Sequence, residues 1–135
     1  MPSPGRLRAW ALAALAHEQG ELTIRIVGSG ESRALNHQFR GRDKPTNVLS
    51  FPYGEGPASG VLGDIVVCAP VVNREAKEQG KLPAAHWAHM VIHGVLHLRG
   101  FDHIRKIEAK VMEQRERAIL ARLSFPDPYV LPGSR

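Results

Sequence analysis

Three histidines within eleven residues have the types and spacing of a metal site. His93 and His97 are four residues apart, so on a helix their rings project from one face a single turn apart and can bind one ion. Gly100 follows, and a residue without a Cβ can adopt the left-handed conformation that ends a helix. The chain can then fold back and add His103 as a third ligand. Three imidazoles with an open fourth position suit a catalytic Zn²⁺, because structural zinc sites usually have four protein ligands.

Two more histidines precede this stretch on the same helical face. His86, His89, His93 and His97 fall within an arc of roughly 80°, so periodicity alone does not select the ligands. The turn at Gly100 selects the ligands, because a His103 that follows it closely can most easily meet His93 and His97. His86 lies about 16 Å along the helix axis from His97, too far to join them. We expect His86 and His89 either to support the ligands and line the pocket or only to pack in the core. A lone histidine usually is a hydrogen-bonded core residue, but three at ligand spacing favour a metal.

The helix that carries these histidines is apolar on nearly every other side, which predicts a central buried helix. Polar rings on such a helix need partners, because an unpaired buried polar group costs roughly 1–3 kcal/mol. A bound metal would meet that need. The sequence therefore predicts a zinc site on the central helix of the fold.

The spacing H-x-x-x-H-x-x-G-x-x-H is similar to the zinc-binding run of metzincin peptidases, apart from the position after the first histidine. Those enzymes have a glutamate there, which takes a proton from the metal-bound water. This chain has Gly94, which offers no base. A metzincin-like zinc peptidase stays as an alternative function, with the missing base as the argument against it.

Length and composition indicate a single domain over residues 1–135. The only cysteine, Cys68, lies in an apolar run, which favours a buried thiol and a reducing compartment. The apolar stretch at 9–16 is too short to span a membrane, so we expect a cytoplasmic protein without a membrane partner. Lys and Arg outnumber Asp and Glu by 18 to 13, a net charge of +5, which beside a catalytic metal makes RNA a plausible substrate.

Periodicity and turn residues predict a small mixed sheet packed with helices, an α+β fold. The first predicted elements are a helix at 7–19, a strand at 22–26, a helix capped by Ser29 that runs to about 39, and a strand at 47–51 stopped by Pro52. A loop at 53–60 and a strand at 61–68 follow. Three further helices are predicted: one that follows the strand and ends at about 79, the histidine helix that begins at 83, and a last one from about 104 to 123.

Three longer runs show a resemblance to a known family. RGRDKPTNVLSFP (40–52), LGDIVVC (62–68) and HWAHMVIHGVLHLRGFDH (86–103) closely resemble the YbeY family of bacterial endoribonucleases, over roughly residues 21–129. The resemblance implies zinc held by His93, His97 and His103 and cleavage of single-stranded RNA. It also implies maturation of the 3′ end of 16S ribosomal RNA and ribosome quality control, with the small subunit and assembly factors as partners.

The resemblance also places the family's functional arginine at Arg40. A guanidinium binds two oxygens of a phosphate in a planar fork, so Arg40 is expected to stabilise the charge that develops on phosphorus. The proton acceptor stays unassigned: Asp102 is expected to orient an imidazole, Asp64 to be structural, and the RNA 2′-hydroxyl to be a candidate nucleophile. A non-catalytic, zinc-stabilised ribosome-binding module is the remaining alternative, and it would need a fourth protein ligand.

Overall fold

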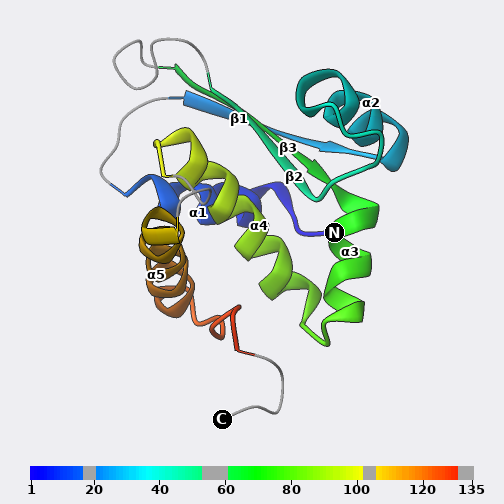
Figure 1. Cartoon of the computed structure of the whole chain (residues 1–135). Helices are drawn as coiled ribbons and strands as arrows, with labels where there is room; N and C mark the ends of the chain where they lie inside the picture. The colour runs from blue at the N-terminus through cyan, green and yellow to red at the C-terminus, as the bar shows by residue number, and fades with distance from the viewer. Residues whose placement is uncertain (17–20, 53–60, 102–105, 131–135) are drawn as a thin grey trace.

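The computed structural model describes residues 1–16, 21–52, 61–101 and 106–130. The predicted loop at 53–60 and the residues Asp102 and His103 lie outside these ranges. Figure 1 shows the arrangement of the elements. Within the described ranges the elements are α1 (Pro4–Leu15), β1 (Glu21–Val27), α2 (Ser29–Arg40), β2 (Val48–Pro52), β3 (Val61–Cys68), α3 (Ala69–Glu78), α4 (Pro83–Leu98) and α5 (Lys106–Arg122).

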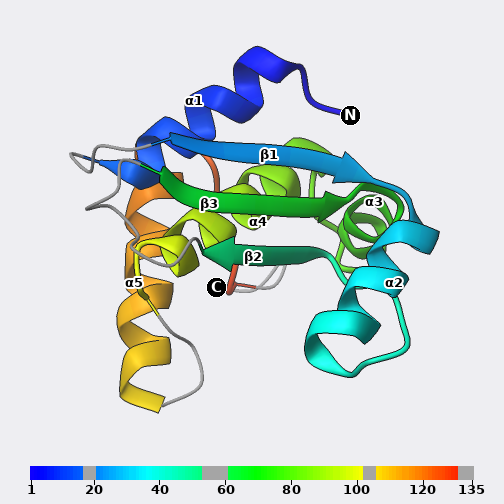
Figure 2. The ribbon, with the colours of Figure 1, turned by 90° about the horizontal axis from the view of Figure 1, so that it is seen from above.

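The three described strands form a mixed sheet in the order β1-β3-β2. The central strand β3 is parallel to β1, with Ile24 opposite Ile65, and antiparallel to β2, with Phe51 opposite Asp64. Figure 2 shows the strands side by side, with β2 at one edge. This arrangement confirms the predicted α+β class.

Helices cover both faces of the sheet, which explains why β3 is apolar along most of its length. Ile65 and Val67 belong to the main core with α1, α4 and α5, whereas Val66 and Cys68 belong to a second cluster beneath α2. In Figure 1, α2 accordingly lies on the opposite side of the sheet from α4. Cys68 is buried, as predicted. No helix in the described part of the chain is both long and apolar enough to cross a membrane.

The histidine helix α4 is the central helix, and 12 of its 16 residues are buried. It packs against α1, α3, α5 and the sheet. Gly94 explains how closely it approaches the sheet: a Cβ there would lie 2.8 Å from Ile65 Cγ2 and 3.2 Å from Val48 Cγ2. The Ser50 hydroxyl of β2 also donates to the Gly94 carbonyl at 3.0 Å. Helix α4 therefore contacts the sheet at position 94, and this close packing explains why a glycine occupies that position.

Some predicted boundaries were wrong. Helix α1 begins at Pro4 rather than at residue 7, because Ser3 caps it: the Ser3 hydroxyl accepts from the Arg6 backbone N–H at 3.3 Å. Ser29 is the first residue of α2, and Gly28 occupies the cap position. Pro52 belongs to β2 as its last residue, where an edge strand tolerates a missing N–H.

Candidate metal centre

Four imidazoles form a row along α4. Neighbouring ring centroids are 6.2 Å apart from His86 to His89, 6.2 Å from His89 to His93, and 4.8 Å from His93 to His97. His86 and His89 are almost fully buried, whereas the side chain of His93 is 22% exposed. The end of the row toward Gly100 therefore holds the closest pair of rings and is nearer to solvent.

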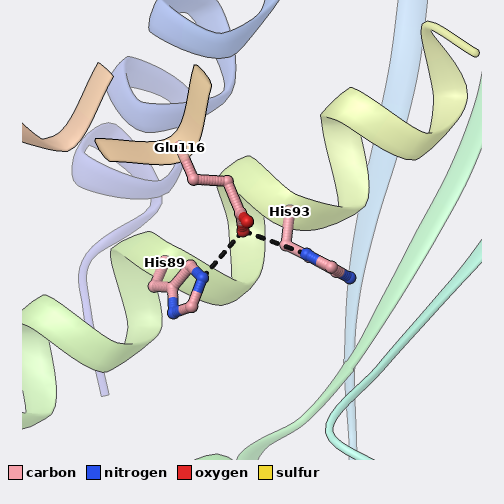
Figure 3. A group of neighbouring side chains, drawn as sticks. All are labelled: His89, His93 and Glu116. Atoms are coloured by element: carbon pink, nitrogen blue, oxygen red, sulfur yellow. Dashed lines mark hydrogen bonds and ion pairs between the residues drawn. The ribbon is translucent and has the colours of Figure 1, made fainter. Parts of the chain in front are cut away.

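Helix α5 places a fully buried carboxylate against this row (Figure 3). Glu116 Oε2 lies 2.7 Å from His89 Nε2 and 3.0 Å from His93 Nδ1. The Tyr129 hydroxyl donates to Glu116 Oε1 at 2.5 Å. One side chain from α5 therefore connects two histidines of α4 with a tyrosine from the segment that follows α5.

Burial by itself would raise the pKa of Glu116, but the hydrogen bonds with His89 and His93 outweigh it and lower the pKa to about 2. Burial lowers the pKa of His89, so the neutral imidazole is favoured there. Burial and the neighbouring carboxylate raise the pKa of Tyr129, which keeps its hydroxyl protonated. At neutral pH this contact joins an ionised Glu116 to a neutral His89 and a neutral Tyr129.

Among the described residues, His89, His93 and Glu116 form a group that could hold a metal ion, with their ligand atoms within 4.8 Å of one another. The contacts in this group are nevertheless those of direct hydrogen bonds. Two ligand atoms on one tetrahedral zinc would be about 3.3 Å apart, given metal–ligand distances near 2.0–2.2 Å. The observed 2.7 and 3.0 Å are shorter, so in this conformation Glu116 contacts the imidazoles themselves.

The structure brings together two of the three predicted ligands, His93 and His97. Helix α4 ends in a turn at Gly100, as predicted: Gly100 has φ +97°, its N–H donates to the His97 carbonyl at 3.0 Å, and Phe101 N–H donates to the Leu96 carbonyl at 3.0 Å. His103 lies outside the described residues. Two imidazoles beside a glycine reversal fit zinc, whose usual ligands include histidine nitrogen.

Arg40 lies apart from the histidine row. It is the last residue of α2, exposed, and followed by Gly41 in the left-handed conformation at φ +70°. Helix α2 packs against β3 and α3, on the opposite face of the sheet from α4. Strand β2 contacts both regions, through Ser50 on the α4 side and Phe51 on the α2 side, and β3 and α3 also pack against both α4 and α2.

Glu116 and Tyr129 were missed by the sequence analysis. A signal for Glu116 was present: Met112, Ile119 and Leu120 lie four residues before and three and four after it, and all are buried. An acid at that position falls on the apolar face of the helix, which predicts a buried carboxylate with partners. Tyr129 carries no such signal, because it lies outside regular structure.

The fold and these residues define an α+β protein with a candidate metal centre on a buried helix. A family model described as endoribonuclease YbeY matches residues 6–124. The endoribonuclease YbeY of Methylococcus capsulatus is 56% identical over 131 residues, 96% of this chain and 87% of that protein. That of Halorhodospira halophila is 58% identical over 135 residues, 95% of this chain and 88% of that protein.

The solution structure of the protein TM1509 from Thermotoga maritima is also similar, with a TM-score of 0.61 and 30% identity, over 97% of this chain and 91% of that one. The chain therefore belongs to the endoribonuclease YbeY family. This confirms the resemblance that the three sequence runs indicated, and with it the class of RNA-cleaving hydrolases.

Proposed function

We propose that the chain is a zinc-dependent endoribonuclease that cleaves single-stranded RNA, with zinc held by His93, His97 and His103. The observation that carries the proposal is the closeness of the His93 and His97 rings, 4.8 Å apart on a buried helix that is followed by the Gly100 reversal. Membership of a family named for RNA cleavage supports the reaction class. When bound, zinc supplies a Lewis acid that polarises a phosphoryl oxygen.

The chain's own contribution at this site is rigidity. His93 and His97 lie on a helix rather than on a loop, and that helix is packed on several sides, so their backbone positions are rigid. Gly94 lets that helix lie directly on β2 and β3. We therefore propose that His93 and His97 are held in position before RNA binds, which reduces the reorganisation needed during the reaction.

Strand β2 offers a path between the histidines and Arg40. Ser50 donates to the Gly94 carbonyl of α4, and Phe51 contacts Phe39 at a ring distance of 5.1 Å. Arg40 directly follows Phe39 at the end of α2. We propose that RNA crosses the β2 edge, with a phosphate bound by the planar fork of Arg40 and the scissile phosphate at the histidines.

Phe39 supports a single-stranded substrate. Its side chain is 57% exposed, which is high for a large aromatic residue, and it lies beside the basic residues Arg40 and Arg42. Unpaired bases stack on such rings, whereas bases inside a duplex already stack on one another. We expect Phe39→Leu to reduce cleavage of single-stranded RNA by about tenfold, since one base stack contributes roughly 1–3 kcal/mol. Leu12→Ala, an exposed apolar residue on α1, is the control.

Arg40 is tested by cleavage rate together with zinc content. Arg40→Ala is expected to retain thermal stability and zinc while cleavage falls at least about tenfold, which corresponds to about 1.4 kcal/mol of barrier. Arg40→Lys should restore only part of the rate, because an ammonium lacks the planar fork. Arg8→Ala removes the same charge from α1 and should leave the rate unchanged. An unfolded or zinc-free Arg40→Ala variant would instead assign Arg40 a structural role.

The nucleophile is tested with a single deoxy substitution. We propose that the 2′-oxygen attacks the adjacent phosphorus and the bond to the 5′-oxygen of the next nucleotide breaks, so a 2′-deoxy residue upstream of the cut should abolish cleavage there. Undiminished cutting would make water the nucleophile. Hydrolysis of casein without RNA cleavage would favour the zinc peptidase, and zinc binding without either activity would favour the non-catalytic module.

For the physiological role we propose maturation of the 3′ end of 16S ribosomal RNA and ribosome quality control in the cytoplasm, with the small subunit and assembly factors as partners. The support is family membership and the net charge of +5, which favours a polyanionic partner. The test is cleavage of a 3′-extended 16S precursor compared with an unrelated single strand of equal length. Equal cleavage of both would contradict a dedicated ribosomal role.

A further inference from the structure

We infer that Glu116 is a positioning residue for the metal site: it fixes the proton of His93 on Nδ1 and thereby presents Nε2 as the ligand atom. The inference deepens the proposed function and rests on His93 as a zinc ligand. Helix α5, which lies outside the histidine motif, would then supply the residue that orients one of the metal ligands.

The hydrogen-bond inventory around Glu116 sets the direction of each contact. An ionised carboxylate only accepts, so each of its neighbours must donate. Tyr129 donates its hydroxyl hydrogen to Oε1, and His89 Nε2 and His93 Nδ1 donate to Oε2, at 2.5, 2.7 and 3.0 Å. A neutral imidazole carries one N–H, so a His93 that donates from Nδ1 has its lone pair on Nε2.

The orientation of the ring agrees with this assignment. In Figure 3 the His93 nitrogen that faces Glu116 is on one side of the ring, and the second nitrogen points away from the carboxylate. A carboxylate behind a metal-bound imidazole fixes the ring's tautomer and orientation and raises the basicity of the ligand nitrogen. Glu116 is placed to do this for His93, from a position that is itself fully buried.

The segment after α5 holds Glu116 in this position. Tyr129 reaches Glu116, and its backbone N–H donates to Asp127 Oδ1 at 2.9 Å. Lys81, which lies between α3 and α4, donates to the Pro128 carbonyl at 2.8 Å. These contacts tie the segment to α5 through Glu116 and to the residues just before α4 through Lys81, so the Glu116 carboxylate is held between α4 and the chain that follows α5.

The alternative is that Glu116 binds the metal directly together with His89 and His93. That arrangement would require the carboxylate to exchange its two short imidazole contacts for metal bonds. The positioning role keeps all three observed contacts and uses the opposite nitrogen of His93. The two possibilities differ in what Glu116→Gln should do to zinc binding.

The first test is the tautomer of His93 in zinc-free protein, read from the imidazole ¹⁵N shifts by NMR at a pH where the ring is neutral. The resonance is assigned by its loss in His93→Gln. We expect the Nδ1–H form in the wild type and loss of its dominance in Glu116→Gln. An Nε2–H form in the wild type would overturn the inference. This readout does not depend on zinc binding or activity.

The second test is the zinc dissociation constant, measured by competition with a chromophoric chelator. Glu116→Gln should weaken zinc binding by about 10–100-fold, the usual effect of losing a partner behind a metal ligand. Glu108→Gln, an exposed residue on the same helix, is the matched control and should have no effect. Unchanged affinity in Glu116→Gln would overturn the inference, and so would a loss as complete as in His93→Ala, which would make Glu116 a ligand.

The two tests separate this inference from the proposed function. Wild-type protein that binds no zinc would end the zinc assignment and with it the ligand role of His93, even if the NMR result shows Glu116 setting the tautomer. If Glu116→Gln fails to fold, the wild-type tautomer still decides whether Glu116 acts on His93 as inferred.

Discussion

Within the described residues, two carboxylates contact imidazoles of α4, and they use the same chemistry at different depths. Glu75 of α3 lies 2.9 Å from His86 Nε2, is 25% exposed and also contacts Asn47. Glu116 of α5 is fully buried and has His89, His93 and Tyr129 as partners. The first contact ties two helices together near the start of α4, whereas the second reaches a predicted metal ligand.

The difference shows that residue types alone do not assign a role to a buried ion pair. Glu75 can exchange a lost partner for water, because part of its side chain is exposed. Glu116 cannot, so its three donors must stay satisfied by the carboxylate. The deeper contact should therefore be the more costly to break and the one connected to metal binding.

The largest expected effect is on stability. Glu116→Ala should lower the free energy of unfolding by roughly 3–5 kcal/mol, because it leaves buried donors without an acceptor. Glu75→Ala should cost about 1 kcal/mol, because water can reach the vacated position. Urea unfolding of zinc-free protein measures both values. Equal costs would remove the proposed contrast between the two contacts.

The next effect separates the two ends of the histidine row by metal content. His97→Ala should weaken zinc binding more than about a hundredfold, or about 2.7 kcal/mol, because it removes a ligand. His86→Ala should leave zinc affinity within about threefold, because its partner is Glu75. Chelator competition gives both constants. If His86→Ala loses zinc as fully as His97→Ala, the ligands extend along the whole row and the contrast is wrong.

A substitution on the sheet side of α4 tests whether the helix position matters apart from its histidines. Gly94→Ala should destabilise the fold by about 1–3 kcal/mol, because the new Cβ would lie 2.8 Å from Ile65 Cγ2. Gly30→Ala is the matched control: nothing lies within 4 Å of its Cβ, and it should be neutral or stabilise by up to about 1 kcal/mol. Thermal unfolding of both variants checks the prediction, and a neutral Gly94→Ala would contradict the close helix-to-sheet contact.

The smallest effect is the pH dependence of the shallower contact. Burial raises the pKa of Glu75, but hydrogen bonds with His86 and Asn47 outweigh it and the pKa is lowered, with Arg74 adding to the effect. Because the folded pKa is below the unfolded value, the stabilisation is present above about pH 4.5 and is lost as the pH falls through the lowered pKa.

The stability gap between wild type and Glu75→Gln should therefore shrink from about pH 6 to about pH 3. Lys81 also faces Glu75, and its charge is constant over this range. A gap that stays constant with pH would show that Glu75 acts through its shape rather than through its charge.

The parts of the site that are local in sequence could be predicted. The four-residue histidine spacing and the Gly100 reversal follow from helix geometry, and the structure has His93 and His97 adjacent before that reversal. The strands could be predicted because alternation and continuous apolar runs report which faces are covered. Ser3 shows the limit at helix ends, where one capping side chain moved the start of α1.

The parts that depend on tertiary contact could not be predicted. Glu116 meets His93 only because α5 packs against α4, and no local pattern states which helices meet. Gly94 has the appearance of a missing base in the sequence, but its neighbours are Ile65 and Val48 of the sheet. Arg40 shares no local pattern with the histidines, and the sequence does not state that α2, which ends at Arg40, lies on the opposite face of the sheet from α4.

The most direct test of the account is the zinc affinity of His103→Ala beside that of Glu116→Gln. If His93, His97 and His103 are the ligands, His103→Ala should weaken zinc binding more than about a hundredfold, and Glu116→Gln by only about 10–100-fold. If His103→Ala binds zinc like the wild type while Glu116→Gln loses it, the ion is held by His89, His93 and Glu116, and the proposed metal site is wrong.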